Sequence, residues 1–292
     1  MEALLSLAFD NLSSYDGPKV RKGLRQVEGL LAQICLSDGR TAQRQEKSAV
    51  DNDRDVTRSP PRKGLGELSQ DPAFREFFKL QEGFEWNVAM RLIGTLDRLM
   101  AKGSDGQNDL LILSALDLIQ GVLLLHPPSK TLFAREQNMN LLLDLLEPFN
   151  CPAIQSATLL TLVVALIDTP SNTRTFEGLD GLLTVTSLFK SRSTSREVKM
   201  KLVEFLYCYL MPETPSIPRA DQLDSVPAML QRSPSKLAGA FTAEGRRKRA
   251  NSYGLLTLTT HEKQELLSRH LSNVEDLVKD LKNCAPFGGV LS

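Results

Sequence analysis

The sequence predicts an all-α fold, and three of its features indicate helices. Apolar residues recur three and four positions apart, as along Val20, Leu24, Val27, Leu31 and Ile34, which is the spacing of one helix face. β-Branched residues rarely alternate with polar ones, so the sequence does not indicate half-buried strands. Clusters of Pro, Gly, Ser and Asp separate the apolar runs and mark the ends of the predicted helices.

The composition indicates a globular protein with a buried core. The chain has 292 residues, of which 41% are hydrophobic, enough for one large or two modest domains. Lys+Arg and Asp+Glu are both 35, so no net charge attracts nucleic acid. One Trp and four Tyr leave few rings to stack on bases. We therefore expect no nucleic acid among the partners.

The start of the chain and its cysteines predict a cytoplasmic protein. An acidic residue at position 2 and the lack of a basic leader argue against a signal peptide. The scattered cysteines, Cys35, Cys151, Cys208 and Cys284, suggest reduced thiols. The longest uncharged window, 148–167, contains two prolines and predicts a buried helix rather than membrane insertion.

Residues 1–36 are predicted to form N-terminal helices of the fold, over 2–13 and 18–36, separated by the breaker "SSYDGP". Residues 37–70 then change character, since charges of both signs, Pro and Gly replace the apolar stripe. Such a segment buries too little apolar area to offset the entropy of ordering, so we expect a disordered insertion there.

The long apolar runs of residues 71–216 recur at a regular interval. Their helices are expected to begin near residues 109, 153 and 196, about 43 residues apart, with Pro-Ser breaks after each. A helical period of this length is typical of armadillo and HEAT repeats, whose units stack to share one core. The sequence therefore predicts an armadillo/HEAT-like helical solenoid, with an irregular helical bundle as the alternative. Phe133 and Phe176, which follow two of the breaks, are expected to anchor short helices.

The end of the chain combines a linker with one amphipathic helix. Residues 217–258 are predicted to be a flexible basic and Ser-Pro linker. Within 259–292, Thr259 and Glu262 have capping-box spacing at the start of a helix, and a tail follows it. The helix places six apolar residues on one face, and we expect it to cap the open end of the solenoid. These residues are Leu267, Leu271, Val274, Leu277, Val278 and Leu281.

No catalytic motif is found, so no enzyme, cofactor or metal site is predicted. The sequence has no GxxxxGK[ST], GxGxxG, GxSxG or HExxH. His126 is expected to be a solvated turn residue, and His261 and His270, nine positions apart, are badly spaced for ligands on one helix. Cys151 and Cys208, in apolar contexts, are expected to be core thiols.

Trp86 has two interpretations, a partner anchor or a core residue at a helix start, and the second is preferred.

Three serines are candidate phosphorylation sites. Arg247 and Arg249 lie five and three residues before Ser252, which suits a basophilic kinase, and phosphate there would place negative charge beside a basic cluster. Ser59 and Ser233 are Ser-Pro sites with basic neighbours. The cluster is itself a candidate recognition patch, although a basic linker or a nuclear-import patch explains it equally well. It comprises Arg246, Arg247, Lys248 and Arg249.

Several segments, in order, resemble one family. They include "LQEGFEWNVAMRLIGTLDRL", "LIQGVLLLHPPSKTLFAREQNMNLLLDLL", "IQSATLLTLVVALIDTPSNTRTFEGLDGLLTV", "VKMKLVEFLYCYLMPE" and "LSNVEDLVKDLKNCAPFG". Together they are similar to the fungal cell division control protein 14 family, a septation initiation network component, and not to the dual-specificity phosphatase of the same name. That phosphatase needs an HCxxGxxR loop, and no cysteine here follows a histidine.

The resemblance implies a non-catalytic subunit that binds a germinal-centre-type serine/threonine protein kinase, together with other septation network components. It implies action at the spindle pole body during mitosis, where the complex promotes septum formation and cytokinesis. Two alternatives stay open: an armadillo-like adaptor for cytoskeletal or transport cargo, and a degenerate enzyme. The partner-binding surface is unknown at this stage.

Overall fold

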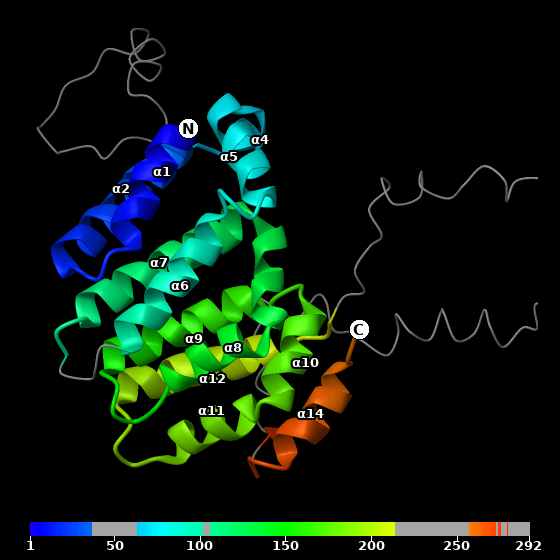
Figure 1. Cartoon of the computed structure of the whole chain (residues 1–292). Helices are drawn as coiled ribbons and strands as arrows, with labels where there is room; N and C mark the ends of the chain where they lie inside the picture. Colours follow the sequence, from blue (N-terminus) through cyan, green and yellow to red (C-terminus); the bar gives the residue numbers. More distant parts are fainter. Residues whose placement is uncertain (37–62, 102–105, 214–256, 273, 276–278, 280–292) are drawn as a thin grey trace, which may run out of the picture. The chain divides into compact units, whose positions relative to one another are not determined.

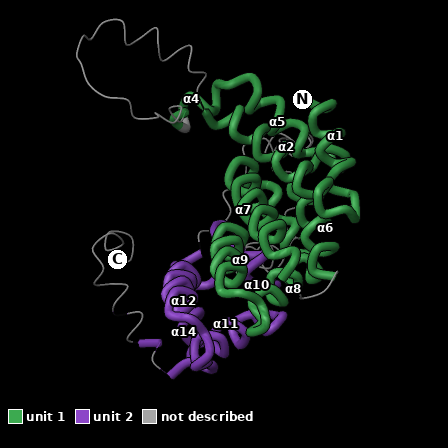
Figure 2. The backbone as a smooth tube through the Cα atoms, turned by 90° about the vertical axis from the view of Figure 1, so that its left-hand side faces the viewer, with its two compact units in different colours: residues 1–165 green, residues 166–292 purple. Residues whose placement is uncertain are grey.

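The computed structural model describes residues 1–36, 63–101, 106–213, 257–272, 274–275 and 279. Every regular element in these ranges is helical and no β-strand occurs among them, so the predicted all-α class is confirmed. Two compact units divide the chain, Met1–Ala165 and Leu166–Ser292 (Figure 2). None of the described helices combines the length and the apolar composition that crossing a bilayer requires.

Several elements of the first unit pack against helix α7 (Figure 1). Helices α2 and α6 and the 3-10 helix η2 pack against α7, while α1 packs against α2 and α6. The bounds are α1 Glu2–Leu12, α2 Gly17–Cys35, α4 Leu65–Gln70, α5 Pro72–Glu82, α6 Val88–Ala101, α7 Asp109–Leu125, η2 Pro127–Ala134, α8 Glu136–Asp144 and α9 Pro152–Leu166. α7 buries most of its apolar residues against its neighbouring elements, but Leu110 and Leu124 stay exposed, so one side of the helix faces solvent.

A buried polar chain joins α5, α6 and η2 in this unit. Asn87 Nδ2 donates to the Gln81 carbonyl at 2.7 Å and to Ser129 Oγ at 3.2 Å. Ser129 Oγ lies 2.8 Å from His126 Nδ1, and the imidazole meets the Phe78 ring edge-on. His126 is only 2% exposed, so its assignment to a solvated turn is wrong. The serine three residues later and the aromatic ring supply the polar and apolar contacts that make burial possible.

The second unit packs four described helices in chain order. α11 packs on both α10 and α12, and α14 packs on α12. Phe176 is fully buried, with its ring 5.6 Å from that of Phe205 and 6.5 Å from that of Tyr209. Phe133 of the first unit is likewise fully buried. The helices are α10 Pro170–Gly178, α11 Gly181–Lys190, α12 Arg196–Leu210 and α14 Thr260–Ser268.

The predicted interval between long helices is present. α7, α9 and α12 begin at residues 109, 152 and 196, so their starts are 43 and 44 residues apart. The stacking of these repeats into a solenoid stays a prediction.

Two expected breaks between the repeats are helical instead. Pro127 begins η2 and Pro170 begins α10, each within the first turn. Proline is compatible with that position because the first backbone N–H groups of a helix have no intrahelical acceptor. The prolines therefore mark helix starts as well as the ends of the helices before them.

The predicted disordered insertion 37–70 is wrong over its last residues. Residues 37–62 lie outside the described residues, but α4 follows at 65–70. Glu67 Oε2 accepts the backbone N–H of Gly64 at 3.0 Å and so caps this helix. The mixed charges of the segment concealed this local cap.

At the other end, α14 begins at the predicted capping box of Thr259 and Glu262. Leu267, Leu271 and Val274 are buried as expected. The other three residues of the predicted stripe lie outside the described side chains.

Candidate functional site

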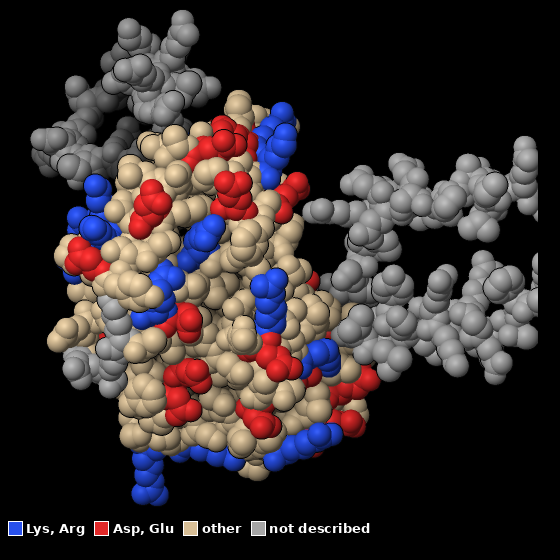
Figure 3. Space-filling model, viewed as in Figure 1, with Lys and Arg blue, Asp and Glu red and all other residues tan. Residues whose placement is uncertain are grey.

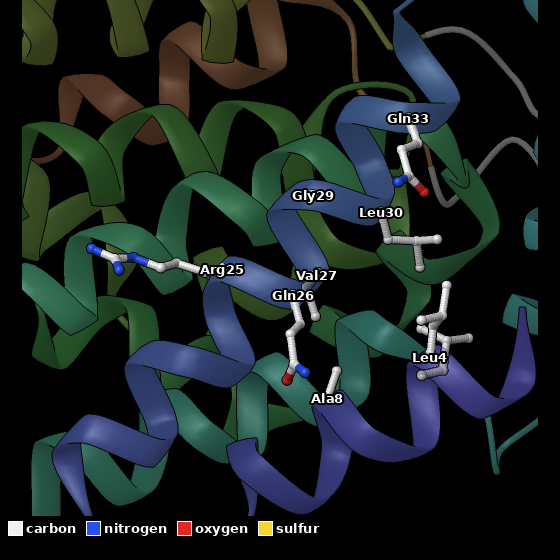
Figure 4. A pocket seen from close by; sticks show the side chains of 9 residues that line it. Leu4, Ala8, Arg25, Gln26, Val27, Gly29, Leu30 and Gln33 are labelled. Atoms are coloured by element: carbon white, nitrogen blue, oxygen red, sulfur yellow. The ribbon is translucent and has the colours of Figure 1, made fainter.

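A groove lies between α1 and α2 in the first unit (Figure 4). Its volume is about 160 Å³. Buried side chains of both helices line it, namely Leu5, Ala8, Val27 and Leu30. We call it the α1/α2 groove.

Gly23 sets the distance between the two helices. A Cβ atom at this position would lie 2.9 Å from both the backbone N and the Cγ of Leu12, and 3.0 Å from the Ala8 carbonyl oxygen. Only a residue without a side chain allows so close a contact. Near one end of the groove Asn11 Nδ2 donates to Gln26 Oε1 at 2.8 Å, which ties α1 to α2 beside the apolar floor.

Gly29 also lies in α2, but its surroundings are different. It is exposed, it lines the groove, and a Cβ atom there would meet nothing within 4 Å. Glycine inside a helix costs about 1 kcal/mol relative to alanine. Helix packing therefore gives no reason for glycine at position 29, and the α2 rim of the groove carries no side chain there.

The rim of the groove combines apolar and polar side chains. Leu4 is 57% exposed, and Leu7, one turn further along α1, is 49% exposed. On the α2 side Gln26 and Gln33 offer amides, and Arg25 extends from one edge (Figure 4). An apolar floor with leucine and arginine at its rim suits the binding of a protein segment.

Helix α2 exposes mainly basic side chains, whereas the wider surface exposes both signs of charge. Lys19, Arg21, Lys22 and Arg25 are all exposed on α2, against one exposed acid, Glu28. Over the face drawn in Figure 3, acidic and basic side chains are interspersed. The α2 side of the groove is therefore locally basic.

A second cluster, in the second unit, holds α14 in place. Glu213 Oε1 accepts from Arg174 Nη2 at 2.7 Å and pairs with Lys263 Nζ at 3.1 Å, and Lys263 also donates to the Met211 carbonyl. Arg174 bonds Glu177 as well, and Tyr209 OH donates to Glu177 Oε1 at 2.7 Å. We call these five residues, Arg174, Glu177, Tyr209, Glu213 and Lys263, the Glu213 clamp.

Burial governs the titration of the Glu213 clamp. It raises the pKa of Glu177, although the hydrogen bond from Tyr209 and the charge of Arg174 act in the opposite direction. It raises the pKa of Tyr209, and the Glu177 carboxylate raises it further. It lowers the pKa of Lys263, against the attraction of Glu213. Two acids face two bases, so the cluster is balanced in charge and its role is structural.

The other candidate residues of the sequence lie apart from both features. Trp86 is half-buried and its ring stacks on Phe9 at 6.2 Å, so part of the side chain packs in the fold and both interpretations stay open. Cys151 is half-buried and Cys208 is exposed, so the expectation of a core thiol is wrong for Cys208. The exposed His261 lies 3.5 Å from Glu265. Among the described residues, no group of three or more His, Cys, Asp or Glu is arranged to hold a metal ion.

The predicted phosphorylation sites and the basic patch lie outside the described residues. They are Ser59, Ser233, Ser252 and the segment 246–249. They stay predictions. The groove was missed from the sequence, where the available signal was a pair of glycines, Gly23 and Gly29, inside one helical pattern.

Two comparisons with known proteins match almost the whole chain. The family model described as "Cell division control protein 14, SIN component" matches residues 1–287. Cell division control protein 14 of Schizosaccharomyces pombe (strain 972) is 29% identical over 297 residues, which cover 99% of this chain and 97% of that protein. No solved structure matches. The family is named for cell division and as a component of the septation initiation network. The chain therefore belongs to the cell division control protein 14 family of septation initiation network components.

Proposed function

We propose that the protein is a non-catalytic regulatory subunit of a germinal-centre-type serine/threonine protein kinase. In this role it promotes septum formation and cytokinesis after mitosis. The observation that carries the proposal is the family match over residues 1–287, to a family described as a septation network component.

The described structure supports a binding role. The α1/α2 groove offers an apolar floor, exposed leucines and a basic edge, which are features of a protein-binding surface. The Glu213 clamp is balanced in charge and engaged in holding helices together. The groove therefore suits the binding of a protein, and the Glu213 clamp stabilises the second unit.

We also propose that the protein acts in the cytoplasm and at the spindle pole body during mitosis, where other septation network components are partners. Phosphorylation of Ser252, Ser59 or Ser233 would regulate these contacts by adding negative charge.

Reconstitution tests the proposed function. The full chain is co-expressed with a germinal-centre-type kinase of the same species, and the mass of the complex is measured by light scattering after gel filtration. We expect a stoichiometric complex, and a change in kinase activity towards a peptide substrate when the chain is present.

Purification from dividing cells supplies the contrasting outcome. If cytoskeletal or transport proteins are the stoichiometric partners and the kinase is absent, the adaptor function replaces the regulatory one.

A further inference from the structure

We propose that the α1/α2 groove is the docking site for an amphipathic helical segment of the kinase partner, one that carries apolar anchors and acidic residues. This inference rests on the proposed function and adds to it the binding surface and the chemistry of the bound segment.

The size of the groove selects the kind of ligand. About 160 Å³ is well below the 300–1,000 Å³ typical of cofactor and small-molecule pockets. A space of this size instead accepts one or two side chains of a protein partner. The floor, formed by Leu5, Ala8, Val27 and Leu30, restricts those side chains to apolar ones.

The exposed leucines of α1 extend the apolar surface beyond the groove. Leu4 and Leu7 lie three positions apart on α1, and about half of the surface of each is exposed to water. A partner helix with anchors at i, i+3 or i+4 matches this spacing, which is how amphipathic helices bind in grooves. Removing the leucines from water supplies a favourable free energy in proportion to the apolar area buried.

The basic side chains of α2 indicate that the polar face of the bound segment carries acidic residues. Arg25 lies at the edge of the groove, and Lys19, Arg21 and Lys22 are exposed on the same helix. The single exposed acid Glu28 leaves an excess of positive charge. Complementary acidic residues on the partner would accelerate association and fix its register.

Two of the glycines in α2, Gly23 and Gly29, allow an effect on folding to be distinguished from an effect on binding. Gly23 is required because α1 touches it, whereas the space beside Gly29 is empty. A side chain at position 29 would raise helix propensity and add bulk at the exposed α2 rim of the groove, where the Cβ position is open. Gly29→Leu should therefore block the site without disturbing the fold.

The experiment measures kinase affinity for variants of the full chain. Gly29→Leu adds a bulky side chain at the α2 rim of the groove, and Arg25→Glu reverses the charge at its edge. Each has a matched control: Gly66→Leu at an exposed glycine of α4 whose Cβ position is also open, and Arg192→Glu at an exposed arginine between α11 and α12. Kd is measured by calorimetry at two salt concentrations, and thermal unfolding is recorded for every variant.

We expect Gly29→Leu and Arg25→Glu each to weaken kinase binding by at least about tenfold, as loss of an interface hot spot does. The two controls should leave the Kd unchanged. Gly29→Leu should unfold at the same temperature as the wild type or higher, so its loss of binding does not come from unfolding. The effect of Arg25→Glu should shrink at high salt, because exposed charges are screened.

The remaining outcomes overturn the inference in distinguishable ways. If the kinase binds all variants equally, or if the controls weaken it as much, the groove is not the docking site, while the proposed function survives. If the wild-type chain does not bind the kinase, the proposed function fails, and this occupant of the groove fails with it.

Discussion

At the residue scale, Lys263 shows how a single charge is accommodated inside the second unit. It is 4% exposed, yet its ammonium pairs with Glu213, donates to the Met211 carbonyl and lies 5.2 Å from the centre of the Tyr209 ring. A buried charge is tolerated only when such partners replace water. Replacing Lys263 by an uncharged residue therefore leaves the buried Glu213 carboxylate with less positive charge beside it.

We expect Lys263→Met to destabilise the protein by about 2 to 3 kcal/mol, because breaking a buried ion pair leaves an uncompensated charge. Urea denaturation at neutral pH measures the change in the free energy of unfolding. The control is Lys201→Met, which removes the exposed pair with Glu204 and should change that free energy by less than about 0.5 kcal/mol. Similar losses in the two variants would contradict the structural role of the Glu213 clamp.

Tyr209 predicts a loss of stability at alkaline pH. Burial, with the nearby Glu177 carboxylate, raises the pKa of Tyr209 above its ordinary value of about 10. The folded state therefore keeps the phenolic proton at a pH where the unfolded state loses it. The stabilisation is complete below about pH 10 and is lost as the pH rises above it.

Absorbance at 295 nm, which follows tyrosinate formation, should show one tyrosine that ionises only when the chain unfolds. Tyr209→Phe should remove that step. A step that persists in this variant would assign it to another tyrosine.

Ser252 carries a prediction about regulation. Arg247 and Arg249 place it in a basophilic recognition pattern, and a phosphate there would meet the basic patch 246–249. We expect phosphorylation in mitosis, seen as slower migration in a phosphate-binding gel, and its loss in Ser252→Ala. An unmodified Ser252 peptide at every stage of the cell cycle, by mass spectrometry, would exclude this site.

At the element scale, α2 places two glycines with opposite roles in one helix. Gly23→Ala should destabilise the protein by about 1 to 3 kcal/mol, because the new Cβ would press on the backbone of α1. Gly29→Ala should stabilise it by up to about 1 kcal/mol through helix propensity. Thermal or urea unfolding of the two variants measures both changes, and each variant is the control for the other. Changes of the same sign would show that the α1–α2 contact is misplaced.

Also at this scale, helix positions could be predicted well from the sequence, except where a helix begins with a Pro-Ser pair. The runs 109–125 and 153–168 predict α7 and α9 to within two residues, because periodicity and flanking prolines are local signals. The Pro-Ser start of α10 predicts a turn from the sequence, whereas the packing of Phe176 against Phe205 stabilises a helix there. Local signals place a helix start, and tertiary contacts decide whether the helix continues.

At the scale of the whole molecule, the described residues that flank each long undescribed range, 37–62 and 214–256, lie close together. Lys63 donates its backbone N–H to the Cys35 carbonyl at 3.0 Å and its ammonium to the Ile34 carbonyl. In the second unit, the Glu213 backbone N–H donates to the Leu258 carbonyl at 3.1 Å, and the Leu258 N–H donates to the Glu213 carboxylate. Each pair of ends is therefore held together by the described residues.

We expect residues 37–62 to be replaceable by a four-residue Gly-Ser linker without loss of helix content. The shorter connection should raise stability by about 1 to 2 kcal/mol, because less loop-closure entropy is lost on folding. Circular dichroism and urea denaturation measure the two effects. A variant that loses helix content would show that residues 37–62 contribute to the core, against the expected disordered insertion.

The sequence by itself determined the helical class, the interval of 43 to 44 residues between the long helices and the family, since all three depend on patterns along the chain. Only the tertiary structure decided that His126 is buried, that Gly23 touches α1 while Gly29 does not, and that Glu213 meets Lys263. The physical reason is distance along the chain. Helix formation is governed by residues three and four apart, whereas burial, close helix contact and charge pairing depend on residues that only folding brings together.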